Sequence, residues 1–437
     1  MASKTITSPL IRHVAKRCYA QASPAVKDAR IQTNVLPNKT IVAALDNGSP
    51  VTRVTIAFRA GSRYEPQSEL GLTHVLRSAA GLSTGNASGF IISRKLAQLG
   101  ASVTASGDRE IIYYTLETTQ EQLPEALECL NNLVSNQEFR PWELSDNAPR
   151  LKYDIVSLTP QVRAVDLLHK AAFRRGLGNS LFISPRRIDA ISSESLQHYI
   201  ANALTPPRCG VSVVGGNLDS AALVANSLVL QCTGDIASEP SKYVSGEARK
   251  EMGGELAHVA VAVQGASATT PEALALAVAA KALGSGPVTK WGATNSPLAK
   301  AIGNIGPFAA AGFNASYSDS GLFGVVLSVP KDEAGAAVKA ATKVLKSPSL
   351  SSDAIKAGKN QLKTQVLSDG DIGSALSESL AAQSLYSGAV RSPLELANAI
   401  DQVTDSQVNQ ALSAAAKSKL SIGAAGNLGS VPYIDEM

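Results

Sequence analysis

Apolar and polar residues alternate with a period of two in two segments that lie far apart in the sequence, residues 51–66 and 256–271. Such alternation is typical of a β-strand that buries one face against a core. The segments align at an offset of 205 residues, and four of sixteen positions are then identical: Val54 and Val259, Ala57 and Ala262, Ser62 and Ser267, and Pro66 and Pro271. The match indicates that the chain contains two copies of one structural unit.

The segments that follow the two strands agree in kind and in order. A helical stripe comes after the first strand (Leu72, Val75, Leu76, Ala79), and an apolar helix over 271–283 comes after the second. Each copy then shows a second helix, a pair of strands and a third helix, at about 88–99, 102–117 and 123–134 in the first copy and 297–302, 308–329 and 333–345 in the second. Each copy ends in an apolar strand, at 209–218 and 420–428. This order predicts an α+β fold, with helices packed on a mainly antiparallel sheet.

Residues 233–250 separate the two copies and combine Gly, Ser, Pro and charged residues, which is the composition of a linker. We therefore expect two homologous lobes, an N-terminal lobe over 20–232 and a C-terminal lobe over 251–437. The longest apolar stretch, residues 273–280, stops at Lys281. A membrane helix needs about 20 apolar residues, so we expect no transmembrane helix.

The first nineteen residues contain Lys4, Arg12, Lys16 and Arg17 and no acidic residue. Basic, acid-free composition with Ser and Thr predicts a mitochondrial transit peptide over 1–19, and the alternative is a plain basic N-terminus. The whole chain has 40 basic and 36 acidic residues, so without these four the remainder has 40 − 4 = 36 of each. A neutral balance gives no support to a nucleic-acid partner.

Several short stretches follow one another along the chain: Leu-Pro-Asn at 36–38, Arg-Ala-Gly-Ser-Arg-Tyr-Glu at 59–65, Gly-Leu-Thr-His at 71–74, Ala-Phe at 172–173 with Leu-Gly at 177–178, and Leu196 and Tyr199 ahead of Val-Val-Gly at 213–215. In this order they resemble the pitrilysin-like, mitochondrial-processing-peptidase family. Active members of that family carry the zinc motif H-x-x-E-H on a helix, in which two histidines bind the metal and the glutamate activates a bound water.

This chain reads His74-Val75-Leu76-Arg77-Ser78 at the motif. Arg77 stands in place of the glutamate and cannot accept a proton, and Ser78 stands in place of the second histidine. At about 4 Å and an effective dielectric near 20, each unit of positive charge beside a bound metal cation raises the free energy by on the order of 4 kcal/mol. Glu143, Asp146 and Asp154 follow downstream without a clear third ligand. We predict no catalytic residue, no metal site and no cofactor.

The other histidines and the cysteines form no ligand cluster. The second copy has Ala-Ala-Lys-Ala-Leu at 279–283, where the first has its motif. His258 matches Arg53 on a predicted strand, His169 and His198 lie alone on predicted helices, and His13 belongs to the basic N-terminus. The four cysteines are widely spaced, which predicts neither disulfides nor haem or iron–sulfur ligation: Cys18, Cys129, Cys209 and Cys232.

Residues 284–287 read Gly-Ser-Gly-Pro, without the spacing of a phosphate-binding loop. We interpret them as a turn. The alternative is a short form of the glycine-rich loop by which non-catalytic processing-peptidase subunits contact substrates.

The C-terminus distinguishes branches of the family. Gly-Asn-Leu at 426–428 and Pro-Tyr-Ile-Asp-Glu-Met at 432–437 are similar to the closing residues of the core proteins of the mitochondrial cytochrome bc1 complex (complex III, ubiquinol-cytochrome c reductase). That resemblance implies a non-catalytic structural subunit, peripheral to the matrix side of the inner membrane. Its implied partners in a dimeric complex are the related core protein 1, cytochrome b, cytochrome c1 and the Rieske protein. The alternative is the non-catalytic, substrate-binding subunit of a mitochondrial processing peptidase.

Overall fold

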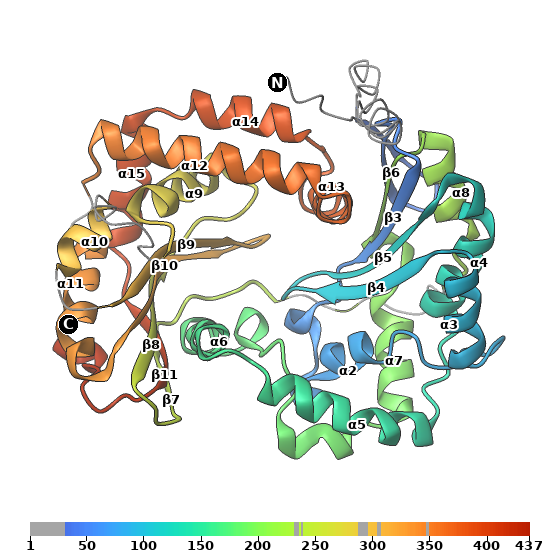
Figure 1. Cartoon of the computed structure of the whole chain (residues 1–437), viewed down its shortest axis with the longest axis horizontal. Helices are drawn as coiled ribbons and strands as arrows, with labels where there is room; N and C mark the ends of the chain where they lie inside the picture. The colour runs from blue at the N-terminus through green and yellow to red at the C-terminus, as the bar shows by residue number, and fades with distance from the viewer. Residues whose placement is uncertain (1–30, 231–235, 237–238, 287–295, 304–306, 347–348) are drawn as a thin grey trace, which may run out of the picture.

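A computed structural model describes residues 31–230, 236, 239–286, 296–303, 307–346 and 349–437. The predicted transit peptide, with His13 and Cys18, lies outside these residues, as do Cys232 and Pro287. Two lobes face each other, each with its own sheet (Figure 1). Among the described residues no helix has the length and the apolar character that a membrane span requires.

The sheet of the N-terminal lobe contains six strands within the described residues, in the order β1-β2-β6-β3-β5-β4. Their bounds are β1 Gln32–Val35, β2 Ile41–Leu45, β3 Val51–Phe58, β4 Ser102–Gly107, β5 Ile112–Thr119 and β6 Cys209–Val214. The pairing of β2 with β6 is parallel, and the other pairs are antiparallel. Strand β6 is buried along its whole length because both faces of the sheet are covered at its centre.

The sheet of the C-terminal lobe contains five strands within the described residues, in the order β7-β11-β8-β10-β9. Their bounds are β7 Gly246–Glu251, β8 Leu256–Gln264, β9 Ala309–Ser316, β10 Gly321–Pro330 and β11 Ser421–Gly426. Strands β8 and β3 hold the two segments that align in the sequence, and both lie between an antiparallel C-terminal strand and an antiparallel hairpin strand. The single parallel pair of the first sheet also recurs, as β7 with β11. The predicted duplication and fold class are confirmed.

Most helices lie on the outer side of the sheet of their own lobe, either on the sheet itself or on a helix that packs on it (Figure 1). In the N-terminal lobe they are α2 Leu72–Ser78, α3 Gly89–Gln98, α4 Leu123–Ser135, α5 Pro141–Val156, α7 Ser193–Ala203 and α8 Leu218–Ser227. In the C-terminal lobe they are α9 Pro271–Leu283, α10 Pro297–Ile302, α11 Ala334–Lys346, α12 Ser352–Asp371, α14 Pro393–Gln402 and α15 Asp405–Ala416. Each set buries aliphatic side chains against its sheet and so forms a separate core for each lobe.

The two lobes exchange one helix each, which the sequence did not predict. Helix α6 (Pro160–Phe173) belongs to the first copy but packs on the inner face of β8 and β11 of the C-terminal lobe. Its Ala164 and Leu168 share a buried cluster with Ala260 and Ala425. In return, α13 (Gly373–Ser387) packs on β3 and β6 of the N-terminal lobe. Each sheet is thereby covered on both faces, and the lobes are joined by two crossed apolar contacts.

Residues 246–250 were predicted to be linker, but they form most of β7. The prediction was wrong there because β7 is an edge strand with the polar sequence Gly-Glu-Ala-Arg-Lys-Glu, which hides the period of two. The chain's C-terminus packs beside this edge. Arg249 donates to the carbonyls of Val431 and Pro432 at 2.9 and 2.6 Å, and its guanidinium stacks on the Tyr433 ring at 3.9 Å.

Candidate functional site

Helix α2, which carries the motif residues, is fixed at its start by Glu65. The buried carboxylate accepts hydrogen bonds from the Gly71 amide at 2.8 Å, from the Thr73 amide at 2.7 Å and from the Thr73 hydroxyl at 2.6 Å. Gly71 adopts a φ of 101°, and a Cβ there would lie 2.7 Å from the side chain of Ile183. These contacts satisfy two of the free amides at the start of the helix and set its direction.

His74 is buried and uncharged. Its Nδ1 accepts a hydrogen bond from the Ile183 amide at 3.2 Å, which leaves the proton on Nε2, and the ring packs edge-on against Phe182. Burial, and then the charge of Arg77, lower the pKa of His74 to about 4, although Asp154 acts in the opposite direction. Asp154 Oδ2 lies 3.8 Å from Nε2. That contact counts as an ion pair only with a protonated ring, and the accepted amide bond and the burial both favour the neutral ring.

Arg77 and Ser78 both make structural contacts. Arg77 Nη2 donates to the Leu181 carbonyl at 2.8 Å, and its Nε donates to the Thr73 carbonyl at 3.2 Å. The Ser78 hydroxyl accepts a hydrogen bond from Asn147 Nδ2 at 2.9 Å. The position of the general base in the zinc motif is therefore occupied by a fixed cation, Arg77. The position of the second ligand is occupied by a hydrogen-bonded hydroxyl, Ser78.

The three downstream acids separate in the structure. Asp154 alone reaches His74; Glu143 accepts hydrogen bonds from the amide and hydroxyl of Ser83, and Asp146 is exposed. In the ranges that the structure describes, no three His, Cys, Asp or Glu residues come together as a metal site. The predicted lack of a metal site stays a prediction, and the chemistry of the groups present agrees with it, because one neutral imidazole and one carboxylate beside an arginine make a poor zinc site.

The other candidate histidines make structural contacts. His258 Nδ1 lies 2.8 Å from the Ser328 hydroxyl of the neighbouring strand, and His198 Nε2 lies 3.2 Å from the Asn202 side chain. His169 lies on helix α6, as predicted, and in addition joins the lobes: its Nε2 lies 2.8 Å from the hydroxyl of Tyr317. In the second copy, Ala279, Ala280, Ala282 and Leu283 are buried in the core of the C-terminal lobe.

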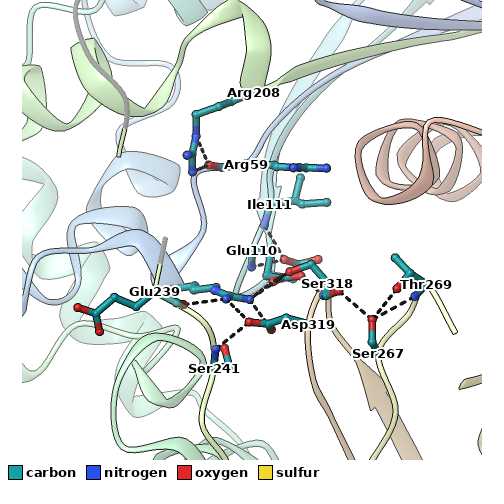
Figure 2. A network of polar contacts seen from close by, with 12 residues as sticks. Arg59, Glu110, Ile111, Arg208, Glu239, Ser241, Ser267, Thr269, Ser318 and Asp319 are labelled. Atoms are coloured by element: carbon teal, nitrogen blue, oxygen red, sulfur yellow. Dashed lines mark hydrogen bonds and ion pairs between the residues drawn. The ribbon is translucent and has the colours of Figure 1, made fainter. Parts of the chain in front are cut away.

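A buried charge cluster, which sequence reasoning missed, joins the lobes around Glu110, Ser318 and Asp319 (Figure 2). Arg63 forms a bidentate pair with Asp319, Nη1 to Oδ1 at 2.8 Å and Nη2 to Oδ2 at 2.5 Å, and its Nη1 also donates to Glu110 at 2.6 Å. Glu110 accepts from the amide and the hydroxyl of Ser318 at 2.9 and 2.6 Å. The side chains of Arg63 and Glu110 are only 4% and 2% exposed. The β9–β10 turn of one lobe is thus fixed to the other by charge-assisted hydrogen bonds.

Burial would by itself raise the pKa of Asp319. The hydrogen bonds from Arg63 and from the Ser241 amide outweigh it and hold the pKa of Asp319 below its ordinary value. Both partners are therefore charged at neutral pH. The available signal in the sequence was weak: Arg63 lies in the quoted stretch 59–65, but its partner follows 256 residues later.

A second buried arginine links this cluster to the motif. Arg109 Nη2 pairs with Asp166 of the exchanged helix α6 at 2.6 Å, and its Nη1 donates to the carbonyls of Leu177 and Asn179. The Asn179 side chain in turn donates to the Ser62 carbonyl at 2.9 Å. The segment 177–183 consequently contacts the motif helix at one end and the junction at the other. A pocket of about 530 Å³ opens beside it, lined among others by Tyr64, Arg175 and His198.

The chain matches two family models, "Insulinase (Peptidase family M16)" over residues 40–184 and "Peptidase M16 inactive domain" over residues 190–362. It is 34% identical to human "Cytochrome b-c1 complex subunit 2, mitochondrial", over 97% of this chain and 96% of that protein. The mouse protein of the same name is 32% identical over the same shares. The chain belongs to the cytochrome b-c1 complex subunit 2 family.

Two further proteins are similar to this chain over most of its length. Potato (Solanum tuberosum) "Mitochondrial-processing peptidase subunit alpha" is 28% identical, over 94% of this chain and 84% of that protein. A chain of "Complex III2 from Candida albicans, Inz-5 bound" superposes with a TM-score of 0.79, covering 93% of this chain and 98% of that one at 19% identity. That superposition shows a shared fold. The family resemblance read from the motifs is confirmed.

The buried His74 predicts that the free energy of unfolding of the chain depends on pH. Its pKa is about 4 in the folded chain and 6.5 ordinarily, so between these values the unfolded chain binds a proton that the folded chain does not. Stability therefore falls as the pH drops, by about 2 kcal/mol between pH 7 and pH 5 from this residue. His74→Asn keeps an acceptor for the Ile183 amide and cannot titrate. In urea unfolding, the free energy of unfolding should fall less between pH 7 and pH 5 in the variant than in the parent chain. An equal fall in both would contradict the assignment of this effect to His74.

The motif also predicts the metal content of the chain. Purified chain, washed with a mild chelator and then given zinc, should retain well under one zinc ion per chain by elemental mass spectrometry. His74→Ala should leave that content unchanged, because a single buried neutral imidazole gives too few ligands for tetrahedral zinc. A stoichiometric zinc ion that is lost in His74→Ala would contradict this.

Proposed function

We propose that this chain is a non-catalytic structural subunit of the mitochondrial cytochrome b-c1 complex (complex III), needed for its assembly and stability. The observation that carries the proposal is the 34% identity to the human subunit 2, which extends over nearly the full length of both proteins and thus over both lobes. We place the chain on the matrix side of the inner membrane, peripheral to it. Its partners there are core protein 1, cytochrome b, cytochrome c1 and the Rieske protein, in a dimeric complex.

The geometry of the motif supports the non-catalytic part of the proposal. Hydrolysis by an M16 peptidase requires a base that takes a proton from a metal-bound water. Arg77 cannot take one, and its guanidinium is held by two carbonyls at that position. The lobes are instead joined by exchanged helices and buried ion pairs. A frame whose lobes are fixed in this way is suited to hold partner subunits rather than to open and close around substrates.

A second function is favoured by one observation, the 28% identity to the alpha subunit of the potato processing peptidase. A chain of that class would hold substrates for a catalytic partner. It would have the same fold as a complex III subunit and would likewise lack the zinc motif. The partner chain therefore decides between the two functions.

Affinity purification of the full-length tagged chain from its own mitochondria tests the proposal. Cytochrome b, cytochrome c1, the Rieske protein and core protein 1 should be recovered in comparable amounts, and depletion of the chain should remove assembled complex III from native gels. The same tag on an unrelated matrix protein is the control. Recovery of a catalytic peptidase subunit without the cytochromes would overturn the proposal in favour of the second function.

A further inference from the structure

Helix α5 presents apolar side chains on two opposite faces. Its inner face is buried against the N-terminal core: Ala148, Leu151 and Ile155. On its outer face Trp142, Tyr153 and Val156 have exposed fractions of 63%, 72% and 81%. A helix on the surface of a globular protein is normally polar on its outer side. The outer face of α5 therefore has the composition of a contact surface that the described part of the chain leaves uncovered.

The outer residues form one continuous seam. Trp142, Pro149 and Val156 are spaced by seven residues, and Tyr153 follows Pro149 by four, which is the spacing of a helix–helix seam. Pro149 and Asp146 are exposed at seam positions. A single polar residue in such a seam lowers the stability of the contact but fixes its register and direction. We define the α5 seam as Trp142, Asp146, Pro149, Tyr153 and Val156.

The α5 seam is accessible to another molecule. Helix α5 packs on α2 and on the short helix Pro185–Ala190, both of the N-terminal lobe. It lies at the lower edge of this lobe, away from the sheet of the C-terminal lobe (Figure 1). A partner on the seam would thus leave the junction of the lobes undisturbed.

One charged residue of the seam, Asp146, and one beside it, Arg150, decide which partner fits. Asp146 and the exposed Arg150 are four residues apart, so they lie on the same flank of the helix. In an antiparallel pair of α5 helices related by a two-fold axis, Asp146 of each copy lies opposite Arg150 of the other. A parallel pair would bring like charges together. The mixed charge also disfavours an anionic membrane surface, which selects clusters of basic residues.

We propose that the α5 seam is a two-fold, antiparallel contact between two copies of this chain, centred next to Pro149. The contact is isologous, so each favourable pair occurs twice. The inference rests on the proposed function in one respect: a dimeric complex III contains two copies that this contact joins.

The size of the seam sets the strength of the contact. An aromatic side chain offers about 200 Å² of surface, and about two-thirds of it is exposed in each of Trp142 and Tyr153. With Val156 added, the seam offers roughly 400 Å² of apolar surface per copy. A stable complex buries about 800 Å² per partner. The seam alone therefore gives a weak dimer, which becomes populated where an assembled complex holds the two copies at a high effective concentration.

Pro149→Cys tests the contact directly, because a residue beside a two-fold axis meets its own copy. The variant is made in the full-length chain with Cys18 and Cys232 changed to serine; Cys129 and Cys209 are buried and stay. Mild oxidation of the purified complex should convert most of the chain to a disulfide-linked dimer on a non-reducing gel. Asn226→Cys, an exposed position on α8 of the same lobe, is the control and should stay monomeric.

Charge reversal gives a test that does not depend on Pro149→Cys. Asp146→Arg and Arg150→Asp should each lower self-association of the full-length chain, measured by sedimentation, by about ten-fold, and the double reversal should restore it. A partner other than a second copy would not be matched by the double reversal. Equal crosslinking in Pro149→Cys and Asn226→Cys, a crosslink to a different polypeptide, or no restoration by the double reversal would each overturn the inference.

The same preparations separate the two proposals. If the other complex III subunits co-purify but the copies do not crosslink, the α5 contact is wrong and the proposed function stands. If those subunits do not co-purify, the proposed function is wrong whatever the crosslinking shows.

Discussion

Arg63→Ala should lower the free energy of unfolding by about 3–5 kcal/mol, since removal of one partner from a buried ion pair leaves the other charge unpaired. Two carboxylates are left without their shared cation, Glu110 with a side chain 2% exposed and Asp319 with one 29% exposed. They belong to different lobes, so their repulsion acts directly on the junction. We expect urea unfolding to show this loss. Relative to the parent chain, hydrogen exchange should become faster in the β9–β10 turn and in residues 62–65, and by more than in either sheet.

A surface ion pair provides the matched control. Lys95 and Glu128 also lie 2.6 Å apart, but their side chains are 37% and 66% exposed, within the N-terminal lobe. Glu128→Gln should cost no more than about 1 kcal/mol. Arg63→Lys should give an intermediate loss because it keeps the charge without the two-pronged geometry that fits Asp319. A cost for Arg63→Ala as small as that for Glu128→Gln would show that the cluster does not hold the lobes together.

Gly423→Val should be at least as destabilising, by about 4 kcal/mol or more, because it forces apart two surfaces that touch backbone to backbone. Gly423 lies on β11 directly beneath α6. A Cβ at this position would come within 2.2 Å of the Ala164 carbonyl oxygen and 2.3 Å of the Leu168 amide nitrogen. Neither backbone atom can move without lifting the exchanged helix from the sheet. Thermal unfolding and the yield of folded chain measure the effect.

Gly85→Ala is the control for this substitution. Gly85 has no positive φ, and a Cβ there would meet its nearest neighbour, the Glu138 carboxylate, at 3.6 Å, which is an ordinary contact. Its thermal midpoint should stay close to that of the parent chain. A folded Gly423→Val chain with an unchanged midpoint would mean that α6 does not pack on β11 as described.

Local sequence patterns predicted the helices and strands that follow each of the two aligned segments. The segments predicted as helices at 88–99, 123–134, 271–283, 297–302 and 333–345 correspond to α3, α4, α9, α10 and α11. The reason is that most of these elements bury one face in their own lobe, which imposes a period of 3.6 or 2 on the sequence, whereas α9 is buried on several faces and is apolar along its length. The polar edge strand β7 has no such face and was missed.

The contacts between the lobes were decided by the tertiary structure alone. The pattern of α6 shows an apolar face but cannot show that this face covers the sheet of the other copy. Arg63 and Asp319, and likewise His169 and Tyr317, are too far apart in the sequence to leave a local signal. The approach of Asp154, and not of Glu143 or Asp146, to His74 depends on how α5 packs beside α2.

The sequence by itself determined that one unit occurs twice and that the positions of a hydrolytic base and a second metal ligand hold Arg77 and Ser78. Both conclusions follow from residue identities at fixed spacing, which can be read without knowledge of the fold. Only the tertiary structure decided that the two units exchange helices and share a buried charge cluster. Such contacts join residues hundreds of positions apart, and their energy depends on distance and burial in space rather than on any neighbour in the sequence.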